Sequence, residues 1–304
     1  MNITKLYQEI KKDNPRALAR AISIVENEVD GYIDLLKNLH FDKKTPIIGV
    51  TGPPGAGKST LVNAIIVNWA KQNKKIGIIA VDPTSPFNYG SLLGDRIRLK
   101  EHYNNPNIFI RSLATRGSLG GLSNKIIEIV DVFRAANFDY ILLETVGVGQ
   151  SEVEIAGLAD TTIVVLVPEA GDEIQTMKAG LMEIADIFVV NKADRAEADR
   201  FAKNLRQLVH SKAASDWSIP VIKTVATRFE GLEKVTTAIA AHHQLNNDNI
   251  EKKAFLLTQK ALQLIRTHRM KDIQVAILQQ KISTQLSEKN FNLYAFLLQD
   301  YISS

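Results

Sequence analysis

The pattern that most constrains the fold of this chain is G-x-x-x-x-G-K-[ST], which it matches at every fixed position with Gly52-Pro53-Pro54-Gly55-Ala56-Gly57-Lys58-Ser59. Glycines in such a loop let backbone N–H groups turn toward a polyanion, and the following helix adds unsatisfied N–H donors at its N-terminus. The pattern has this meaning only between a strand and a helix. Residues 46–51 have the composition of a buried strand, and residues 60–70 are apolar at helical spacing. The sequence therefore predicts a phosphate-binding loop rather than an ordinary glycine-rich turn.

Two side chains of this loop have the chemistry that a bound nucleotide requires. We expect the Lys58 ammonium to meet the β- and γ-phosphates and the Ser59 hydroxyl to bind Mg²⁺. The expected nucleotide-contacting set runs from Gly52 to Thr60 and so includes the start of the helix.

A second motif, Asn191-Lys192-Ala193-Asp194, predicts which base is bound. An aspartate after N-K-x can accept hydrogen bonds from both N1–H and the exocyclic amine of guanine, whereas adenine offers neither donor in that arrangement. Residues 186–190 indicate a buried strand, so the motif lies at a strand's carboxyl end, where open α/β sheets bind ligands. Asp194 is therefore the expected specificity residue for GTP or GDP. The alternatives are an adenine nucleotide, or a helix cap with a nearby charge.

Strand-like runs recur along the chain, with helical patterns between most of them. This alternation predicts an α/β fold of the P-loop NTPase type, with a mostly parallel sheet covered by helices on both faces. The segment 83–106 is an exception, because it is too long for an ordinary connection, and we expect it to be functional. The expected strands after the phosphate loop are 75–81, 108–113, 139–144, 161–167, 186–190 and 219–224.

Two regions flank this core. We expect residues 1–42 to be an N-terminal extension of two helices, 3–11 and 15–39, and residues 43–247 to be the nucleotide domain. Residues 248–304 have the apolar repeats of helices. That apolar surface must be buried, either on the same subunit or on a second one, and the sequence leaves both arrangements open.

Composition excludes several classes of protein. The chain has no cysteine, which rules out disulfides and thiolate metal sites and agrees with a reducing compartment. Residues 1–20 contain no apolar block, so we expect no secretory signal or transit peptide, and a cytoplasmic protein. No apolar run is long enough to span a bilayer. The 37 basic residues exceed the 33 acidic ones only slightly and form no dense stripe, so nucleic acid is not an expected partner.

Candidate catalytic groups lie between the two nucleotide motifs. The segment Glu144-Thr145-Val146-Gly147-Val148-Gly149-Gln150 follows a strand, in the position of the D-x-x-G element of GTPases. There Glu144 can organise Mg²⁺ or its water, and the Gly147 N–H can hydrogen-bond the γ-phosphate and be released on hydrolysis. Val148 stands where Ras-like proteins have a water-orienting glutamine. An apolar side chain cannot orient water, so we expect slow unassisted turnover.

Two aspartates are further candidates. Asp82 ends a strand, and if that strand neighbours the one before the phosphate loop, its carboxylate emerges beside the loop and can position Mg²⁺-bound water or the nucleophile. Its alternative role is to initiate an Asp-Pro turn. Asp95 supplies another carboxylate in the long segment, where a solvated charge is an equally ordinary interpretation.

Together these motifs resemble the MeaB/ArgK family of P-loop GTPases, whose characterised members are chaperones of adenosylcobalamin-dependent methylmalonyl-CoA mutase. The resemblance extends over residues 40–245, with the motifs in order. Its most specific pieces are E-T-V-G-V-G-Q at 144–150 and G-D-E-I-Q at 171–175, which ordinary GTPases lack. The chain departs mildly from the family in its paired prolines at 53 and 54, and at residues 86–89, where relatives are often small and polar.

The resemblance implies a homodimeric G protein that binds the mutase. GTP binding and hydrolysis would gate cofactor loading and would protect or reactivate the mutase, while the cobalamin belongs to the partner. Residues 248–304 would be a dimerisation arm, and hydrolysis would be slow alone and stimulated by the partner.

The resemblance also assigns roles to individual residues. Residues 169–178 are similar to an additional switch of the family, in which Gln175 and Lys178 couple partner contact to hydrolysis. Without the resemblance, this segment would indicate a solvated helix start. Ala226 stands where GTPases make a backbone contact to the base. The implied phosphate and Mg²⁺ residues are Lys58, Ser59, Asp82, Asp95 and Glu144, and the implied guanine residues are Asn191, Lys192 and Asp194.

Two other functions compete with this interpretation. A metallochaperone GTPase needs soft or imidazole ligands, and this chain has no cysteine and six histidines, of which only His242 and His243 adjoin. We expect that pair at an exposed helix end. A kinase of a transport protein, the older interpretation of the ArgK branch, is disfavoured by the guanine motif, because kinases generally use ATP.

Overall fold

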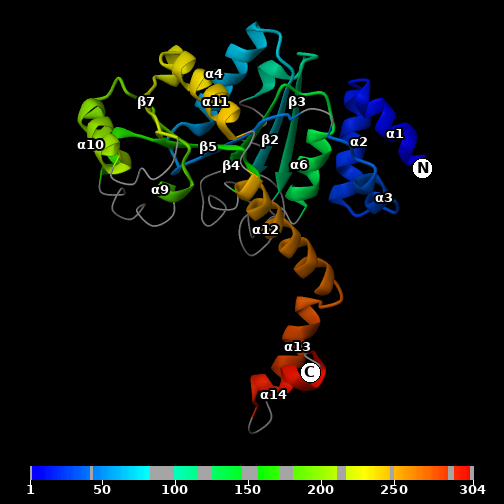
Figure 1. The fold of residues 1–304 in the computed structure, drawn as a ribbon. Coiled ribbons are helices and arrows are strands. Elements are labelled where there is room, and N and C mark those ends of the chain that lie inside the picture. The colour runs from blue at the N-terminus through cyan, green and yellow to red at the C-terminus, as the bar shows by residue number, and fades with distance from the viewer. Residues whose placement is uncertain are drawn as a thin grey trace. The chain divides into compact units, whose positions relative to one another are not determined.

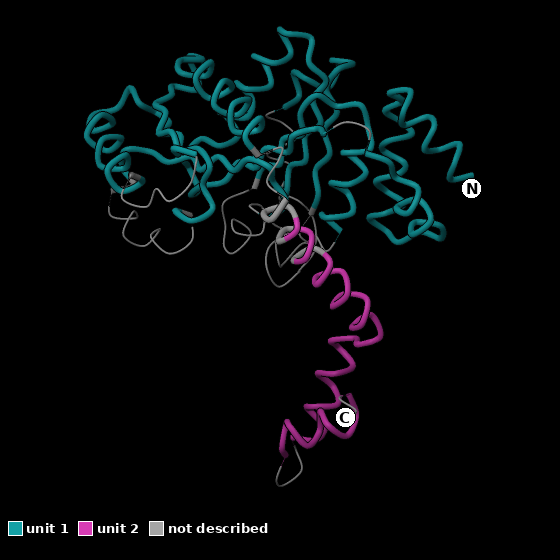
Figure 2. Tube along the Cα trace, viewed as in Figure 1, with its two compact units in different colours: residues 1–250 teal, residues 251–304 magenta. Residues whose placement is uncertain are grey.

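The computed structural model describes residues 2–41, 44–82, 99–114, 125–145, 157–171, 181–210, 217–246, 250–286 and 291–301. The chain divides into two compact units, residues 1–250 and 251–304 (Figure 2). The first unit combines the regions that we expected as an N-terminal extension and a nucleotide domain. The second unit begins close to the expected boundary at residue 248.

A seven-stranded sheet forms the centre of the first unit (Figure 1). The strand order is β3-β2-β4-β1-β5-β6-β7, and every neighbouring pair is parallel. The predicted α/β fold is confirmed. The strands are β1 (Ile47–Thr51), β2 (Ile76–Asp82), β3 (Ile108–Ala114), β4 (Tyr140–Thr145), β5 (Thr161–Leu166), β6 (Ile187–Val190) and β7 (Val221–Lys223).

Helices cover both faces of this sheet. α4 (Lys58–Lys71) and α11 (Leu232–Asn246) pack on one face. On the other face, α6 (Ile126–Arg134) and the N-terminal helices cover the β3 side, and α10 (Ala198–His210) covers the β6 side. None of the described helices is both long and apolar enough to cross a membrane. The short elements are η1 (Lys100–His102), η2 (Pro168–Gly171), α9 (Leu181–Ile184) and η3 (Ala226–Arg228).

The strands are apolar in continuous runs because they are buried on both faces. Every residue of β1, β5 and β6 is buried. Successive residues enter opposite cores. Along β4, for example, Ile141 and Leu143 join the core under the N-terminal helices and α6, whereas Leu142 joins the core under α4.

The N-terminal region forms three helices, so the prediction of two was wrong. α1 (Ile3–Lys11) and α2 (Pro15–Glu26) begin at the expected residues, but the chain leaves the helix before α3 (Tyr32–Lys37). Glu28 and Gly31 have φ angles of 49° and 91°, which a right-handed helix cannot contain. The apolar pattern continues across this break because α2 and α3 contribute to the same core as α6.

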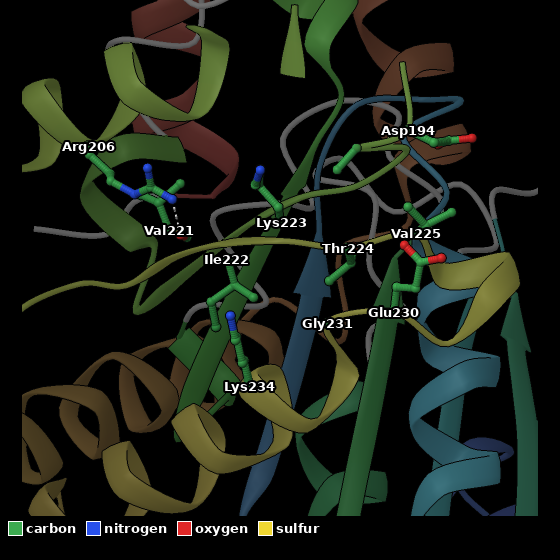
Figure 3. Close-up of a pocket in the computed structure, with 11 residues that line it drawn as sticks. Asp194, Arg206, Val221, Ile222, Lys223, Thr224, Val225, Glu230, Gly231 and Lys234 are labelled. Carbon is green, nitrogen blue, oxygen red and sulfur yellow. Dashed lines mark hydrogen bonds between the residues drawn. The ribbon is translucent and has the colours of Figure 1, made fainter. Parts of the chain in front are cut away.

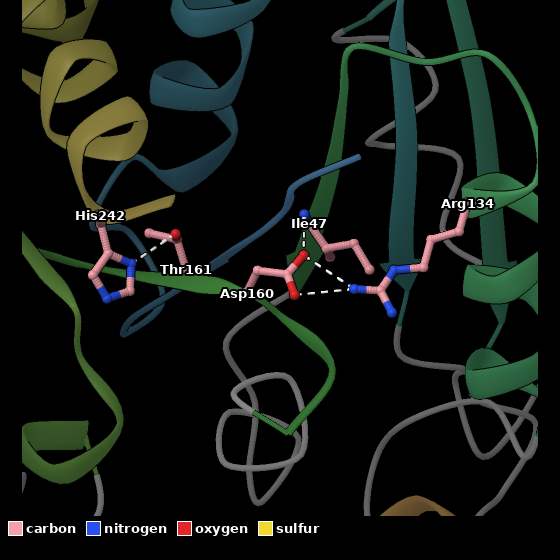
Figure 4. A network of polar contacts seen from close by, with 5 residues as sticks. All are labelled: Ile47, Arg134, Asp160, Thr161 and His242. Carbon is pink, nitrogen blue, oxygen red and sulfur yellow. Dashed lines mark hydrogen bonds and ion pairs between the residues drawn. The ribbon is translucent and has the colours of Figure 1, made fainter. Parts of the chain in front are cut away.

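A polar network joins several elements at the amino ends of the strands (Figure 4). The Asp160 carboxylate, just before β5, accepts the Ile47 N–H at the start of β1 at 2.8 Å. The same carboxylate accepts two hydrogen bonds from Arg134 of α6, at 3.0 and 3.1 Å. One side chain thus joins β1, β5 and α6.

His242 of α11 belongs to the same end of the sheet. Its Nδ1 lies 2.8 Å from the Thr161 hydroxyl oxygen, and its Nε2 lies 3.2 Å from a carboxylate oxygen of Asp186. His242 is 2% exposed, so the prediction of an exposed helix end was wrong for this residue. Polar partners at the starts of two strands explain why a histidine is tolerated there.

The C-terminal unit consists of α13 (Val275–Leu286), α14 (Leu293–Asp300) and most of α12 (Ile250–Arg269). Among its residues whose burial is described, only Phe296 is buried, with its ring centroid 6.1 Å from that of Phe291 and 5.6 Å from that of Tyr301. Lys281 of α13 places its ammonium 5.2 Å from the Tyr301 ring centroid. This unit therefore has a small aromatic core and leaves much apolar surface uncovered.

We predict that Asp160→Ala lowers the free energy of unfolding by about 1–3 kcal/mol, because the Ile47 N–H and Arg134 lose their shared acceptor. Urea unfolding followed by circular dichroism measures this change. The control is Glu197→Ala, which removes a pair with Arg200 whose side chains are 63% and 78% exposed and should change stability by less than about 0.5 kcal/mol. Equal losses in the two variants would contradict the role of Asp160.

Candidate nucleotide-binding site

The loop between β1 and α4 is held close to β5. Gly52, Gly55 and Gly57 have φ angles of 136°, 76° and 88°, which residues with a Cβ rarely adopt. A Cβ on Gly52 would lie 2.1 Å from the carbonyl oxygen of Val165 in β5. Glycine is therefore required where the loop turns past the neighbouring strand.

Lys58 begins α4 and directs its ammonium back into this loop. The residue is 6% exposed, and Nζ donates to the carbonyl oxygens of Gly52 at 2.7 Å and Pro53 at 3.0 Å. The helix is fixed on the sheet by its apolar face and by Trp69, whose ring stacks on Tyr140 of β4 with centroids 4.0 Å apart. A lysine ammonium held at the N-terminus of a rigid helix is suited to a polyphosphate.

The side-chain amide of Asn191 joins the phosphate loop to the second motif. Asn191 follows β6 and is 3% exposed. Its Nδ2 donates to the Ala56 carbonyl oxygen at 3.0 Å, and a Cβ on Gly57 would lie 2.3 Å from the same nitrogen. Lys192 adds a hydrogen bond from Nζ to the Gly55 carbonyl oxygen at 2.8 Å. Two motifs that are far apart in the sequence therefore form one structure.

On its other side, Asn191 holds the segment that follows β7. Its Oδ1 accepts hydrogen bonds from the Thr224 hydroxyl at 3.1 Å and from the Ala226 N–H at 3.2 Å. The Ala193 N–H donates to the Thr224 carbonyl oxygen at 3.0 Å. The turn that carries Asp194 is therefore fastened to the ends of both β6 and β7.

These segments line a pocket of about 240 Å³. Asp194, the expected specificity residue, lines it together with Ala226 and with Gly57 and Thr60 from the phosphate-loop side. The two sequence motifs thus border one space at the carboxyl ends of the strands. The complete lining is Gly57, Thr60, Asn191, Lys192, Asp194, Arg195, Val225, Ala226 and Thr227.

Two of the three carboxylates expected at the Mg²⁺ site, Glu144 and Asp82, lie in the described strands and differ in their distance from the loop along the sheet. Glu144 is 4% exposed and pairs in register with Val50 of β1, so it lies on the strand beside the phosphate loop. Asp82 ends β2, and β4 separates β2 from β1. The condition that these two strands are neighbours is therefore not met. A buried carboxylate on the strand beside β1, such as that of Glu144, is of the hard oxygen type that Mg²⁺ prefers.

The long segment after β2 is described only from residue 99 onward. There, His102 Nε2 lies 2.6 Å from Asn63 Oδ1 of α4, so η1 is docked on the phosphate-loop helix. Burial in this contact lowers the pKa of His102. The expected site residues that lie outside the described residues are Asp95, Gly147, Gln175 and Lys178.

Three residues around the pocket were not predicted from the sequence. Thr224 supports Asn191, and Arg228 places Nη2 3.6 Å from Asp194 Oδ2. Arg195 donates to the Glu169 carboxylate, and this hydrogen bond lowers the pKa of Glu169. The sequence indicates these residues only by their position a few residues from a predicted motif or contact. That position does not predict the direction of a side chain.

Comparisons with known proteins point to one family. A family model described as "Methylmalonyl Co-A mutase-associated GTPase MeaB" matches residues 18–281. A relative from Pyrococcus abyssi is 47% identical over 247 residues, which cover 80% of this chain and 76% of the relative. GTPase ArgK of Escherichia coli is 34% identical over 248 residues, which cover 78% of this chain and 75% of ArgK.

A solved structure shows the same fold. The crystal structure of an LAO/AO transport system kinase superposes with a TM-score of 0.68 at 23% identity, and the match covers 98% of this chain and 95% of the other. The family resemblance inferred from the sequence motifs is confirmed by these comparisons.

We predict that Gly57→Ala destabilises the nucleotide-free protein more than Gly55→Ala, although both glycines have positive φ. A Cβ at residue 57 would meet Asn191 Nδ2 at 2.3 Å, whereas one at residue 55 has nothing within 4 Å. We expect a loss of about 1–2 kcal/mol for Gly55→Ala from backbone strain alone. For Gly57→Ala we expect roughly 3 kcal/mol or more, because overpacking and a broken hydrogen bond are added. Urea unfolding measures both losses, and equal values would mean that the Asn191 contact is unimportant.

Proposed function

The chain belongs to the MeaB family of methylmalonyl-CoA mutase-associated GTPases, and on this basis we propose that it is a GTP-binding and GTP-hydrolysing chaperone of an adenosylcobalamin-dependent mutase, with methylmalonyl-CoA mutase as the expected client. In this role, GTP binding and hydrolysis gate cofactor loading and protect or reactivate the mutase. The cobalamin is bound by the mutase and not by this chain.

One observation supports the nucleotide part of this proposal above all. The Asn191 amide contacts the phosphate loop, and Asp194, three residues later, lines the pocket that the loop borders. A nucleotide can therefore place its phosphates at the loop and its base against Asp194. The carboxylate accepts from N1–H and the exocyclic amine of guanine, while the Ala226 backbone approaches the base from the β7 side.

Hydrolysis in this site relies on positioning and electrostatics. Lys58 exchanges its contacts with the Gly52 and Pro53 carbonyls for the β- and γ-phosphates, and the loop N–H groups hold the same oxygens. Ser59 and Glu144 would hold Mg²⁺, with Asp82 and Asp95 as further candidates from the family resemblance. When bound, Mg²⁺ would neutralise negative charge on the phosphate oxygens.

Slow turnover by the protein alone follows from the valine at position 148, which cannot orient water. Gly147 is proposed to sense the γ-phosphate through its N–H group. Partner contact is proposed to act through Gln175 and Lys178, which follow η2. η2 carries Glu169, whose pairing with Arg195 connects the start of this segment to the pocket rim.

The C-terminal helices are proposed to form a homodimer. Leu257, Leu262 and Ile265 of α12 are 52%, 42% and 48% exposed, and the small aromatic core of this unit does not include them. A contiguous apolar helix face of this kind usually has a partner. For a family with a dimerisation arm, a second copy of the same helix is the simplest partner for this face.

The alternatives have less support. A nickel metallochaperone would need soft or imidazole ligands, and the chain has no cysteine, while His242 is held by Thr161 and Asp186. The name of the LAO/AO transport system kinase applies to that protein, and a likeness at 23% identity shows only the fold.

We predict that an adenosylcobalamin-dependent acyl-CoA mutase from the same genome stimulates hydrolysis of GTP, but not of ATP, by the purified protein. Lys58→Ala should lower turnover at least about a hundredfold, because the phosphates lose a buried positive charge. Lys12→Ala is the control and should keep wild-type turnover, because the Lys12 side chain is 72% exposed and its described ion pair is with the nearby Glu9.

Phosphate release, measured with and without the mutase, distinguishes the two parts of the proposal. Tight GTP binding without stimulation would retain the GTPase and reject this client. Equal hydrolysis of ATP would reject the assignment of guanine.

We predict that the double variant Leu262→Glu, Ile265→Glu sediments as a monomer under conditions where the wild-type protein is a dimer. Two charges on the apolar face of α12 cannot be desolvated in an interface without a partner. Gln263→Glu adds a charge to the same helix outside this apolar pair and should leave the dimer intact. Analytical ultracentrifugation measures the change. If the wild-type protein sediments as a monomer, the proposed dimerisation through the C-terminal helices is wrong.

A further inference from the structure

The carboxylate of Asp194 has a second neighbour that the nucleotide motifs do not include. The side chain of Asp194 is 48% exposed, and Nη2 of Arg228 lies 3.6 Å from its Oδ2. Among the described residues, this is the contact that the structure gives for the carboxylate. A half-exposed aspartate on a turn is free to rotate unless another group orients it.

Arg228 is itself held in place by a compact loop. Its Nε lies 3.2 Å from Glu230 Oε1. The backbone closes around it, since the Val225 N–H donates to the Glu230 carbonyl oxygen at 3.2 Å and the Glu230 N–H donates back to Val225 at 3.3 Å. Between them, Phe229 has φ of 60°, which is uncommon for a bulky residue. The guanidinium thus extends from a loop with fixed geometry.

The guanidinium approaches the carboxylate from outside the 240 Å³ pocket. Arg228 is absent from the described lining of that pocket and of its larger neighbour of about 400 Å³ (Figure 3), whereas Asp194 lines both. Glu230 lines the larger pocket (Figure 3). The carboxylate therefore stands between two spaces, with Arg228 engaging one of its oxygens and leaving lone pairs on both for a base.

We propose that Arg228 is a positioning residue for guanine recognition, which orients the Asp194 carboxylate toward N1–H and the exocyclic amine of the base. This inference rests on the proposed function, because it requires a guanine nucleotide in the pocket. A guanidinium inside the pocket would compete with the base, but one that contacts the carboxylate from behind reduces the rotational freedom lost on binding.

The test compares GDP affinity of the nucleotide-free full-length protein and its variants by isothermal titration calorimetry. Arg228→Ala should weaken GDP binding about two- to five-fold, as for a half-exposed ion pair, and the effect should shrink at high salt. Arg228→Lys keeps the charge and should recover most of the affinity. Arg200→Ala removes an arginine whose side chain is 78% exposed and should have no effect.

A second background separates positioning from a general effect on the loop. In Asp194→Asn, the amide can donate to the 2-oxo group of xanthine, so this variant should bind xanthosine diphosphate. Because the ion pair no longer exists there, adding Arg228→Ala should leave that affinity unchanged. An equal loss in both backgrounds would show that Arg228 supports the loop and not the carboxylate, and would overturn the proposal.

Two other results would also overturn it. Unchanged GDP affinity in Arg228→Ala would remove the role of Arg228, and tighter binding would show that Arg228 obstructs the site. If the wild-type protein binds ADP as tightly as GDP, the proposed guanine site fails. If the wild-type protein prefers GDP to ADP but Arg228→Ala has the same GDP affinity as the wild-type protein, only the inference about Arg228 fails.

Discussion

The nucleotide site depends on a single buried amide, that of Asn191. Its nitrogen donates to the phosphate loop and its oxygen accepts from the segment after β7, so one side chain sets the spacing between three segments that are remote in the sequence. An amide suits this position because it presents donors and an acceptor at one group without charge. The strand order β1-β5-β6-β7 brings the ends of these segments close together. The Asn191 amide then joins them by hydrogen bonds.

Much of the sheet could be predicted from the sequence because strands buried on both faces leave continuous apolar runs. The predictions that were wrong would have required knowledge of tertiary contacts. The apolar pattern of the N-terminal region continues across a break, since the chain turns at Glu28 and Gly31 and returns to the same core. The sequence predicts an exposed helix end for His242. In the structure, Thr161 and Asp186 at the starts of two strands provide its polar partners.

The candidate site divides in the same way. The position of Lys58 in the loop could be predicted, because the motif encodes the local geometry that directs its ammonium toward the loop carbonyls. The relation of Asp82 to the phosphate loop could not, because it depends on which strand lies next to β1, and that place belongs to β4. The contact between Arg228 and Asp194 could not be predicted either, since it depends on a loop closed by Val225 and Glu230.

The stacking of Trp69 on Tyr140 also gives this protein its own optical probe. The chain has two tryptophans. Trp69 lies on the phosphate-loop helix, and Trp217 lies 4.9 Å from the ring of His242, centroid to centroid, with its indole N–H bonded to the Asp186 carbonyl at 2.8 Å. One indole therefore reports on the helix that follows the phosphate loop, and the other on the amino ends of the strands. Substituting each in turn separates, in intrinsic fluorescence, events at the nucleotide from changes in the frame that supports it.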